Sequence, residues 1–420
     1  MLAKFNRLID NEEKKRFLGN FFSLAMLQGM NYILPLLSLP YLVRVLGADK
    51  FGLLAFATAI IGYFIVLTDY GFNFTATREV TLHRDDKDKL SEIFSSVMII
   101  KFLLFVISFF ILTLLIILFK KFSSDPWLYY LTFGTVLGQI LFPVWFFQGV
   151  EQMRYITIIN IVSKILFTIA IFVLVKQSSD YLLVPLLTSL GAIFAGIYSL
   201  FLVYKRFDIK FKIQKIHILI SYLKGGSNLF YTSVLGNLLT SSGTVILSFV
   251  STNTVVGYYS AAERLFRAVV GLFAPITQAL YPISCRKVMY EETARSYIRK
   301  IALIIGGMAF FIGTTVAIFS EKIITIVYGG AFPSYSYILA VMMIWLFFGV
   351  INNIIGIQYL SASRKDKFYT FSFVVAGLVT VLLNLVLIPH LLINGVLVAM
   401  IVGEILLTIC MLALIFRFKL

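Results

Sequence analysis

Apolar residues occur along this chain in long runs that short polar stretches separate. A helix needs about 20 consecutive apolar residues to cross a bilayer, and twelve runs approach or exceed that length. The pattern therefore predicts an all-α integral membrane protein with 12 transmembrane helices. The predicted spans cover residues 17–43, 51–73, 90–119, 127–149, 154–176, 181–204, 222–250, 254–283, 298–319, 335–360, 368–388 and 393–416.

Composition supports this prediction. Hydrophobic residues make up 60% of the 420 positions and charged residues only 13%. A soluble domain has about 45–50% apolar and about 25% charged residues, so an ordinary soluble enzyme and a disordered chain are excluded. The two cysteines, Cys285 and Cys410, form no Cys-x-x-Cys motif, which excludes a disulfide scaffold.

The net charge of +16 is distributed unevenly about the predicted spans. With the N-terminus in the cytoplasm, 26 of the 36 Lys and Arg residues fall on the cytoplasmic side and six on the outer side. This bias follows the positive-inside rule, so the basicity reports topology and no nucleic-acid partner is expected. Acids among the first 16 residues argue against a cleavable signal, so we expect the first span to be retained and both termini to be cytoplasmic.

The longest polar interruption divides the predicted spans into two groups of six. We expect an N-terminal lobe over 1–204, a basic cytoplasmic linker over 205–221 and a C-terminal lobe over 222–420. A faint internal repeat supports the division, because an offset of 205 residues places Gly52 on Gly257. Transporters built from two such halves hold their substrate between them, so the sequence predicts two six-helix lobes around a central cavity.

Seven charged residues lie inside the predicted spans away from the span ends, and each costs about 2.5–3.5 kcal/mol at the helix centre. Such residues are expected to face the protein interior or a wet cavity. The cations are Lys101, Lys164, Arg264 and Arg267, and the acids are Asp69, Glu263 and Glu404. For Lys101 and Lys164, which lie up to about three turns inside their spans, the competing interpretation is a long side chain that reaches the lipid headgroups.

The eighth span concentrates these charges. Glu263 and Arg267 are four residues apart with the acid first, which is the favourable order for an ion pair within a helix. That pair would leave Arg264 as an unbalanced cation, and a guanidinium suits phosphate oxygens. The competing interpretation is a structural charge network that holds spans together.

The remaining polar candidates leave several roles open. Asp69 can titrate, pair with a cation or bond the backbone at a helix end, and Glu404 is either an ion site or a structural acid. Amide side chains inside spans either join helices or hydrogen-bond sugar hydroxyls. The candidates for lining a polar cavity are Gln28, Asn31, Asn228, Asn352 and Asn353.

Motifs for catalysis or cofactor binding are not apparent in this sequence. "KGGS" at 224–227 lacks the P-loop pattern, and the Asp-x-Asp at 86–88 falls in a short loop without a nucleotide-binding domain. The three histidines are isolated from one another and predict no metal site. We therefore expect no catalytic residues and no cofactor.

Three segments resemble the Wzx-type polysaccharide flippases of the multidrug/oligosaccharidyl-lipid/polysaccharide exporter superfamily. These are "LLSLPYLVRVLGADKFGLLAFATAIIGYFIVLTDYGFNFTATREV", "GGSNLF" and "VGYYSAAERL". The resemblance implies translocation of an undecaprenyl-pyrophosphate-linked O-antigen repeat unit across the bacterial inner membrane by alternating access. It also implies that the Glu263-Arg264 pair and further cavity cations bind the pyrophosphate.

Partners follow from the same resemblance. Coupling to protons or sodium through Asp69, Glu263 or Glu404 is an open hypothesis, as is contact with the O-antigen polymerase machinery. A monomer is expected, because two lobes in one chain already enclose a site.

Three other functions compete with a flippase. A multidrug exporter of the same fold would expel organic cations and favour an acid-rich cavity, whereas here the cations inside spans outnumber the acids four to three. An O-antigen polymerase or ligase would be an enzyme, and the short outer loops argue against it. A structural scaffold would gain nothing from seven charges inside the membrane.

Overall fold

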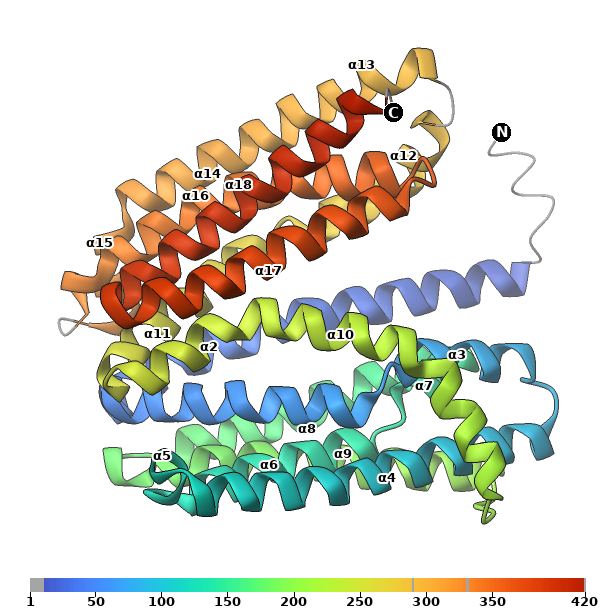
Figure 1. Ribbon diagram of the computed structural model, residues 1–420. Coiled ribbons are helices and arrows are strands. Elements are labelled where there is room, and N and C mark those ends of the chain that lie inside the picture. The colour runs from blue at the N-terminus through green and yellow to red at the C-terminus, as the bar shows by residue number, and fades with distance from the viewer. Residues whose placement is uncertain (1–10, 289–290, 330–331, 419–420) are drawn as a thin grey trace. The chain divides into compact units, whose positions relative to one another are not determined.

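The computed structural model describes residues 11–288, 291–329 and 332–418. These residues form α-helices with short 3-10 and π-helical segments, and the described part of the chain contains no strand (Figure 1). The prediction of an all-α protein is therefore confirmed.

The chain divides by its internal contacts into two compact units. The first unit comprises 1–38 and 57–237, and the second comprises 39–56 and 238–420. These limits differ from those of the predicted lobes, because 39–56 packs within the second unit and 205–237 within the first. The division of the spans into two groups of six stays a prediction.

The first unit is built from the two ends of a long kinked helix and the helices that follow it. The elements are α2 (Asn11–Asp69, of which 39–56 belongs to the second unit), α3 (Phe72–Leu82), α4 (Lys87–Leu118), α5 (Lys120–Ser123), α6 (Pro126–Leu141), α7 (Val144–Gly149), α8 (Met153–Leu174), η1 (Ser178–Leu182), α9 (Leu183–Phe207) and the first part of α10 (Ile216–Val250). Trp145, Phe146 and Phe147 lie fully buried in its core.

The second unit continues from α10. Its elements are α11 (Asn253–Gly271), α12 (Ala274–Val288), α13 (Glu291–Ile301), η2 (Ala302–Gly306), α14 (Gly307–Ile318), α15 (Ser320–Tyr328), η3 (Pro333–Tyr335), α16 (Ser336–Asn353), η4 (Ile354–Ser361), α17 (Asp366–Leu391) and α18 (Ile393–Arg417). η2 and η4 are π-helical, a geometry that is often found at functional sites. α17 and α18 lie side by side along their length (Figure 1).

Nine helices of the described residues are long and apolar enough to cross a membrane, or ten if the bent pair within α10 is counted. Two predicted spans merge in α2, where Gly47 breaks the helical backbone at φ 73°. α11 and α12 together cover the charged eighth span, and the break between them follows Gly271. The helices are consistent with twelve spans, and the chain is a multi-pass membrane protein.

The predicted basic linker is only partly helical. α9 ends at Phe207, Asp208 adopts a left-handed conformation, and the chain stays non-helical until α10 begins at Ile216. The backbone N–H of Lys210 donates to Ser91 Oγ at 3.1 Å, and that of Lys212 donates to Ser95 Oγ at 2.9 Å. The linker is therefore bound across α4 rather than free in solvent.

The two glycines matched by the internal repeat contact each other's helices within the second unit. A Cβ on Gly52 would lie 1.8 Å from the carbonyl oxygen of Asn253, and one on Gly257 would lie 1.9 Å from that of Ala48. Ala48 and Asn253 are 205 residues apart, as are Gly52 and Gly257. Each glycine therefore meets the repeat equivalent of the residue that the other glycine meets, so the contact is reciprocal. The missing side chains allow the two helices to approach closely, as in other membrane helix pairs.

Candidate functional site

A polar cavity of about 340 Å³ lies inside the second unit. We call it the charged cavity, because five residues singled out from the sequence line it: Glu263, Arg267, Asn352, Asn353 and Glu404. They come from α11, α16 and α18, with α10 and α17 completing the walls. Other polar lining residues are Thr240, Tyr259, Tyr369, Thr380 and Asn384.

Glu263 and Arg267 form the predicted ion pair on one turn of α11. Arg267 donates to Glu263 Oε1 from Nε at 3.0 Å and from Nη2 at 2.5 Å. Glu263 is 14% exposed, whereas the Arg267 side chain is 54% exposed. Thr244 of α10 lies 3.5 Å from the second carboxylate oxygen. The pair therefore has a half-buried acid and an accessible cation.

Glu404 has an amide partner rather than a cation. Asn352 Nδ2 donates to the Glu404 carboxylate and, at 2.9 Å, to the Glu404 backbone carbonyl. Thr408 Oγ1 in turn donates to Asn352 Oδ1 at 2.6 Å. Among the described residues this carboxylate forms no ion pair with Lys or Arg. Of the three acids singled out inside the predicted spans, Glu404 is therefore the one that no cation neutralises in this part of the chain.

Arg264 lies apart from its neighbour in sequence. Its guanidinium stacks 5.2 Å from the centre of the Phe51 ring, and it is not among the described residues that line the charged cavity. Within the described residues it has no carboxylate partner, as predicted from the Glu263–Arg267 pair.

A second polar pocket, of about 250 Å³, lies inside the first unit. Lys101 Nζ donates to Asp69 Oδ1 at 3.1 Å, and the Lys101 side chain is only 5% exposed. Lys101 therefore does not reach the lipid headgroups, and of the roles left open for Asp69 the structure selects pairing with a cation. The other polar lining residues are Thr68, Asn73, Gln139 and Ser233.

The other predicted residues of this unit lie elsewhere. Lys164 is exposed and donates to Asn31 Oδ1 at 2.6 Å, which joins α8 to α2. Gln28 is exposed on α2. The side chain of Asn228 lies outside the described residues.

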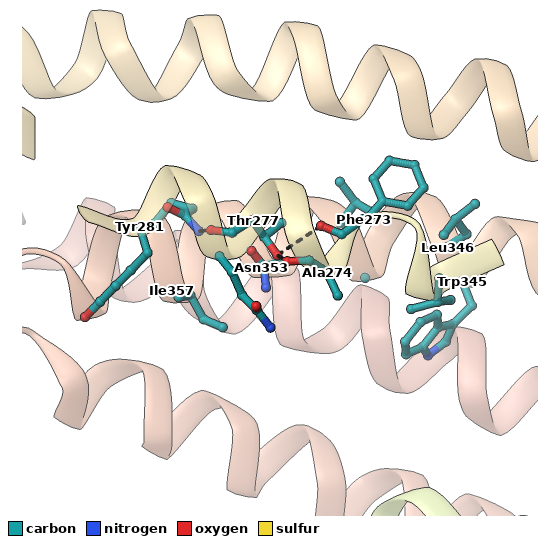
Figure 2. A pocket seen from close by; sticks show the side chains of 13 residues that line it. Phe273, Ala274, Thr277, Tyr281, Trp345, Leu346, Asn353 and Ile357 are labelled. Carbon is teal, nitrogen blue, oxygen red and sulfur yellow. Dashed lines mark hydrogen bonds between the residues drawn. The ribbon is translucent and has the colours of Figure 1, made fainter. Parts of the chain in front are cut away.

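A third cavity, of about 590 Å³, lies between α11–α12 and α16–η4 of the second unit. We call it the neutral groove. Figure 2 shows Phe273 and Trp345 toward one end, Tyr281 toward the other and Asn353 between them. Trp345, Gly349 and Asn353 line both this groove and the charged cavity.

Several lining residues were not identified from the sequence. Asn384 is 97% buried in α17, where its Oδ1 has no hydrogen-bond partner among the described residues. Its position inside an apolar run is the same signal that selected Asn352, so it was detectable. Trp345 and Tyr259 carry no such signal, because an aromatic residue in a span is more often packed in the core.

The described residues do not suggest a metal centre, because no three His, Cys, Asp or Glu side chains converge in them. The polar groups that line the cavities are two ion pairs, one carboxylate that is hydrogen-bonded to an amide, and several further amides. Such groups can bind, orient and release a polar solute.

Comparisons with known proteins identify relatives along most of the chain. The family described as "Polysaccharide biosynthesis protein" matches residues 17–288. A protein of Escherichia coli (strain K12) named "Putative O-antigen transporter" is 30% identical over 374 residues, covering 89% of this chain and 90% of that protein. A protein of the same name from Shigella dysenteriae is 27% identical over 318 residues, covering 74% and 77%.

Solved transporter structures share the fold. The "Lipid II flippase MurJ, inward closed conformation" has a TM-score of 0.71 at 18% identity, covering 96% of this chain and 87% of that one. An inward-facing multidrug resistance MATE family transporter of the MOP superfamily has a TM-score of 0.67 at 15% identity, covering 92% and 94%. These identities show a common fold, and they confirm the predicted fold resemblance.

The family match covers well over half of the chain, and the Escherichia coli relative is aligned along 89% of it. The chain belongs to the polysaccharide biosynthesis protein family.

Proposed function

We propose that this protein translocates an undecaprenyl-pyrophosphate-linked O-antigen repeat unit from the cytoplasmic to the periplasmic leaflet of the bacterial inner membrane. The observation that carries the proposal is the 30% identity, along 89% of the chain, to a protein named "Putative O-antigen transporter". The family and the flippase-like fold agree with it. Translocation proceeds by alternating access, in which the two halves expose the substrate site to each side in turn.

The pyrophosphate is the part of such a substrate that the hydrocarbon core excludes most strongly. Arg264 and Lys164 are the best candidates to bind it, since neither has a carboxylate partner among the described residues. Arg267 and Lys101 are held by Glu263 and Asp69, so they bind the pyrophosphate only by exchanging one anion for another. The accessible guanidinium of Arg267 suits that exchange better than the buried ammonium of Lys101.

The asparagines contribute the neutral part of the site. The Asn352 amide already donates to Glu404, whereas Asn353 Oδ1 has no hydrogen-bond partner among the described residues and is available to a ligand. Asn31 orients Lys164, and Gln28 and Asn228 are assigned to the polar lining on the basis of the sequence.

Coupling is assigned to Glu404. It lies half-buried against Asn352 without a cation partner in the described chain, so a proton or a sodium ion is the charge that can balance it. Glu263 and Asp69 already hold cationic side chains and have less capacity for a second cation.

A multidrug exporter is the second candidate function, and one observation favours it. The charged cavity holds two carboxylates, Glu263 and Glu404, but only one guanidinium, that of Arg267. Such a cavity suits an organic cation as well as an ion-coupled flippase.

The proposal is tested by complementation. The chain is expressed in a bacterium that lacks its own O-unit flippase and makes the matching lipid-linked unit, and surface O-antigen is measured. Wild type, Arg264→Ala and Arg299→Ala are compared at equal protein levels. Arg299 is an exposed residue of α13 outside the cavities, so it serves as the matched control.

Restoration by wild type and Arg299→Ala, with at least about a tenfold loss in Arg264→Ala, is the expected result; tenfold corresponds to about 1.4 kcal/mol. Restoration by all three proteins supports the flippase but excludes Arg264 as a pyrophosphate ligand. No restoration, together with expulsion of ethidium from the same cells, favours the multidrug exporter.

A further inference from the structure

The neutral groove has a lining that selects against charged ligands. It is open to a ligand of substantial size, with about 590 Å³ of space, and none of its 13 lining residues is Asp, Glu, Lys or Arg. Its walls combine apolar side chains with rings and amides. Ligand sites of this kind bind molecules that are neutral and partly apolar, with a few polar groups that fix their orientation.

Two amides in the groove are without hydrogen-bond partners. Asn353 Oδ1 is buried and has no partner among the described residues, and Gln278 of α12 is exposed with no side-chain hydrogen bond in that part of the chain. Gln358 differs, because it accepts from Ser284 Oγ at 2.7 Å and donates to the Thr277 carbonyl at 2.9 Å. Gln358 therefore holds the groove together, while Asn353 and Gln278 remain for a ligand.

Trp345 supplies a rigid flat surface beside these amides. A Cβ on Gly349 would lie 3.0 Å from its indole ring, so the glycine makes room for the ring to lie along α16. Phe266 packs edge-on against the same indole, with ring centres 5.1 Å apart. The ring is thus fixed by packing before any ligand arrives, which lowers the entropic cost of binding.

The groove is continuous with the charged cavity along one stripe of α16. Trp345, Gly349 and Asn353 are spaced four residues apart and line both spaces. A single ligand can therefore place a charged group near Arg267 and a neutral group in the groove.

We propose that the neutral groove binds a neutral pyranose unit of the lipid-linked glycan, with the sugar face on Trp345 and its hydroxyls on Asn353 and Gln278. This inference rests on the proposed function and assigns a site to one part of its substrate. A pyranose has an apolar C–H face and a rim of hydroxyls, which matches one ring flanked by two amides. An isoprenoid chain is the weaker occupant, because it would cover both amides without bonding them.

The test measures tryptophan emission from the purified full-length protein in lipid nanodiscs. One arm is titrated with the undecaprenyl-pyrophosphate-linked repeat unit, and the other with undecaprenyl pyrophosphate that carries no sugar. We expect an emission shift with the glycosylated carrier, no shift with the bare carrier and no shift in Trp345→Phe. The comparison separates the sugar from the lipid and the pyrophosphate.

Affinity measurements give a second readout. Gln278→Leu and Asn353→Leu are each expected to weaken binding of the glycosylated carrier about tenfold and to leave binding of the bare carrier unchanged. Gln214→Leu, in the basic linker, is the matched control and should change neither affinity. Because Gln278 is exposed, its variant keeps the test informative if Asn353→Leu does not fold.

An equal shift with both carriers would overturn the inference, since the lipid or the pyrophosphate would then account for the signal. A wild type that restores surface O-antigen but shows no sugar-dependent shift overturns the sugar site and leaves the proposed function standing. A wild type that neither restores O-antigen nor binds either carrier overturns both.

Discussion

Neighbouring residues in one span have opposite roles, and the second unit shows this at Asn352 and Asn353. Asn352 is 4% exposed and its amide joins α16 to Glu404 and Thr408 of α18. Asn353 follows it directly, about 100° further around the helix, and its Oδ1 is unpartnered in the described structure. The first is therefore a structural amide, and the second is available for binding.

Asn352→Ala is expected to destabilise the protein by about 1–3 kcal/mol, because the half-buried Glu404 carboxylate loses its hydrogen-bond donor. Asn353→Ala removes no side-chain hydrogen bond to any described residue and should melt at the wild-type temperature. Thermal unfolding of the purified proteins in detergent checks the pair. Equal melting temperatures for the two variants would show that the hydrogen bonds from Asn352 to Glu404 contribute nothing to stability.

Lys101 and Asp69 should behave as one unit in folding. Lys101→Met leaves a carboxylate unpaired at membrane depth and is expected to cost about 3 kcal/mol, with a marked loss of folded protein. The double variant Lys101→Met/Asp69→Asn should recover most of this loss, because neither charge is then unpaired. Folded protein is measured by fluorescence-detected size exclusion. Additive losses in the double variant would mean that the two side chains act independently.

At the scale of the helices, close packing and local breaks position the site. The π-helical η4 carries Gln358 to α12, and the break after Gly271 turns α12 so that Thr277 and Gln278 line the neutral groove. The reciprocal contact of Gly52 and Gly257 brings the first part of the repeat against α11, the helix that carries Glu263 and Arg267.

Gly52→Ala and Gly257→Ala should each destabilise the protein by about 1–3 kcal/mol or more, since the added methyl group meets a backbone carbonyl that a rotamer change cannot move. Gly29→Ala is the control, because a Cβ at this helical position meets nothing within 4 Å. We expect it to be neutral or stabilising by up to about 1 kcal/mol. Melting temperatures that fall equally in all three variants would contradict the close-contact explanation.

At the scale of the whole molecule, the distribution of charge predicts the orientation of the chain in the membrane. The segment between the second and third predicted spans carries four cations: Arg78, Arg84, Lys87 and Lys89. The segment near Ser124 carries two, Lys120 and Lys121. The positive-inside rule therefore predicts that the first segment is cytoplasmic and the second periplasmic.

Reporter fusions test this orientation. Alkaline phosphatase inserted after Ser124 should be active, because it folds only in the periplasm, and the same insertion after Asp85 should be inactive. Green fluorescent protein at either position should give the opposite pattern. Activity of the phosphatase after Asp85 but not after Ser124 would show that the chain has the opposite orientation.

The sequence by itself determined the class of fold and the contacts that are local in the chain. Long apolar runs predicted the helices, because in a bilayer a chain satisfies its backbone hydrogen bonds in helices or closed β-barrels, and continuous runs of about 20 apolar residues fit only the helix. The Glu263–Arg267 pair was predictable for a similar reason, since residues four apart on a helix always lie on one face. The repeat also marked Gly52 and Gly257, although not that they contact each other's helices.

Only the tertiary structure decided which distant residues share a cavity. Glu404 and Asn352 are 52 positions apart, and Lys101 and Asp69 are 32 apart. Helical periodicity gives the face of the helix on which each residue lies. It does not give how deeply that face is buried or which helix packs against it, because these depend on how whole helices pack. For the same reason Arg264 lies against Phe51 while the adjacent Glu263 lines the charged cavity.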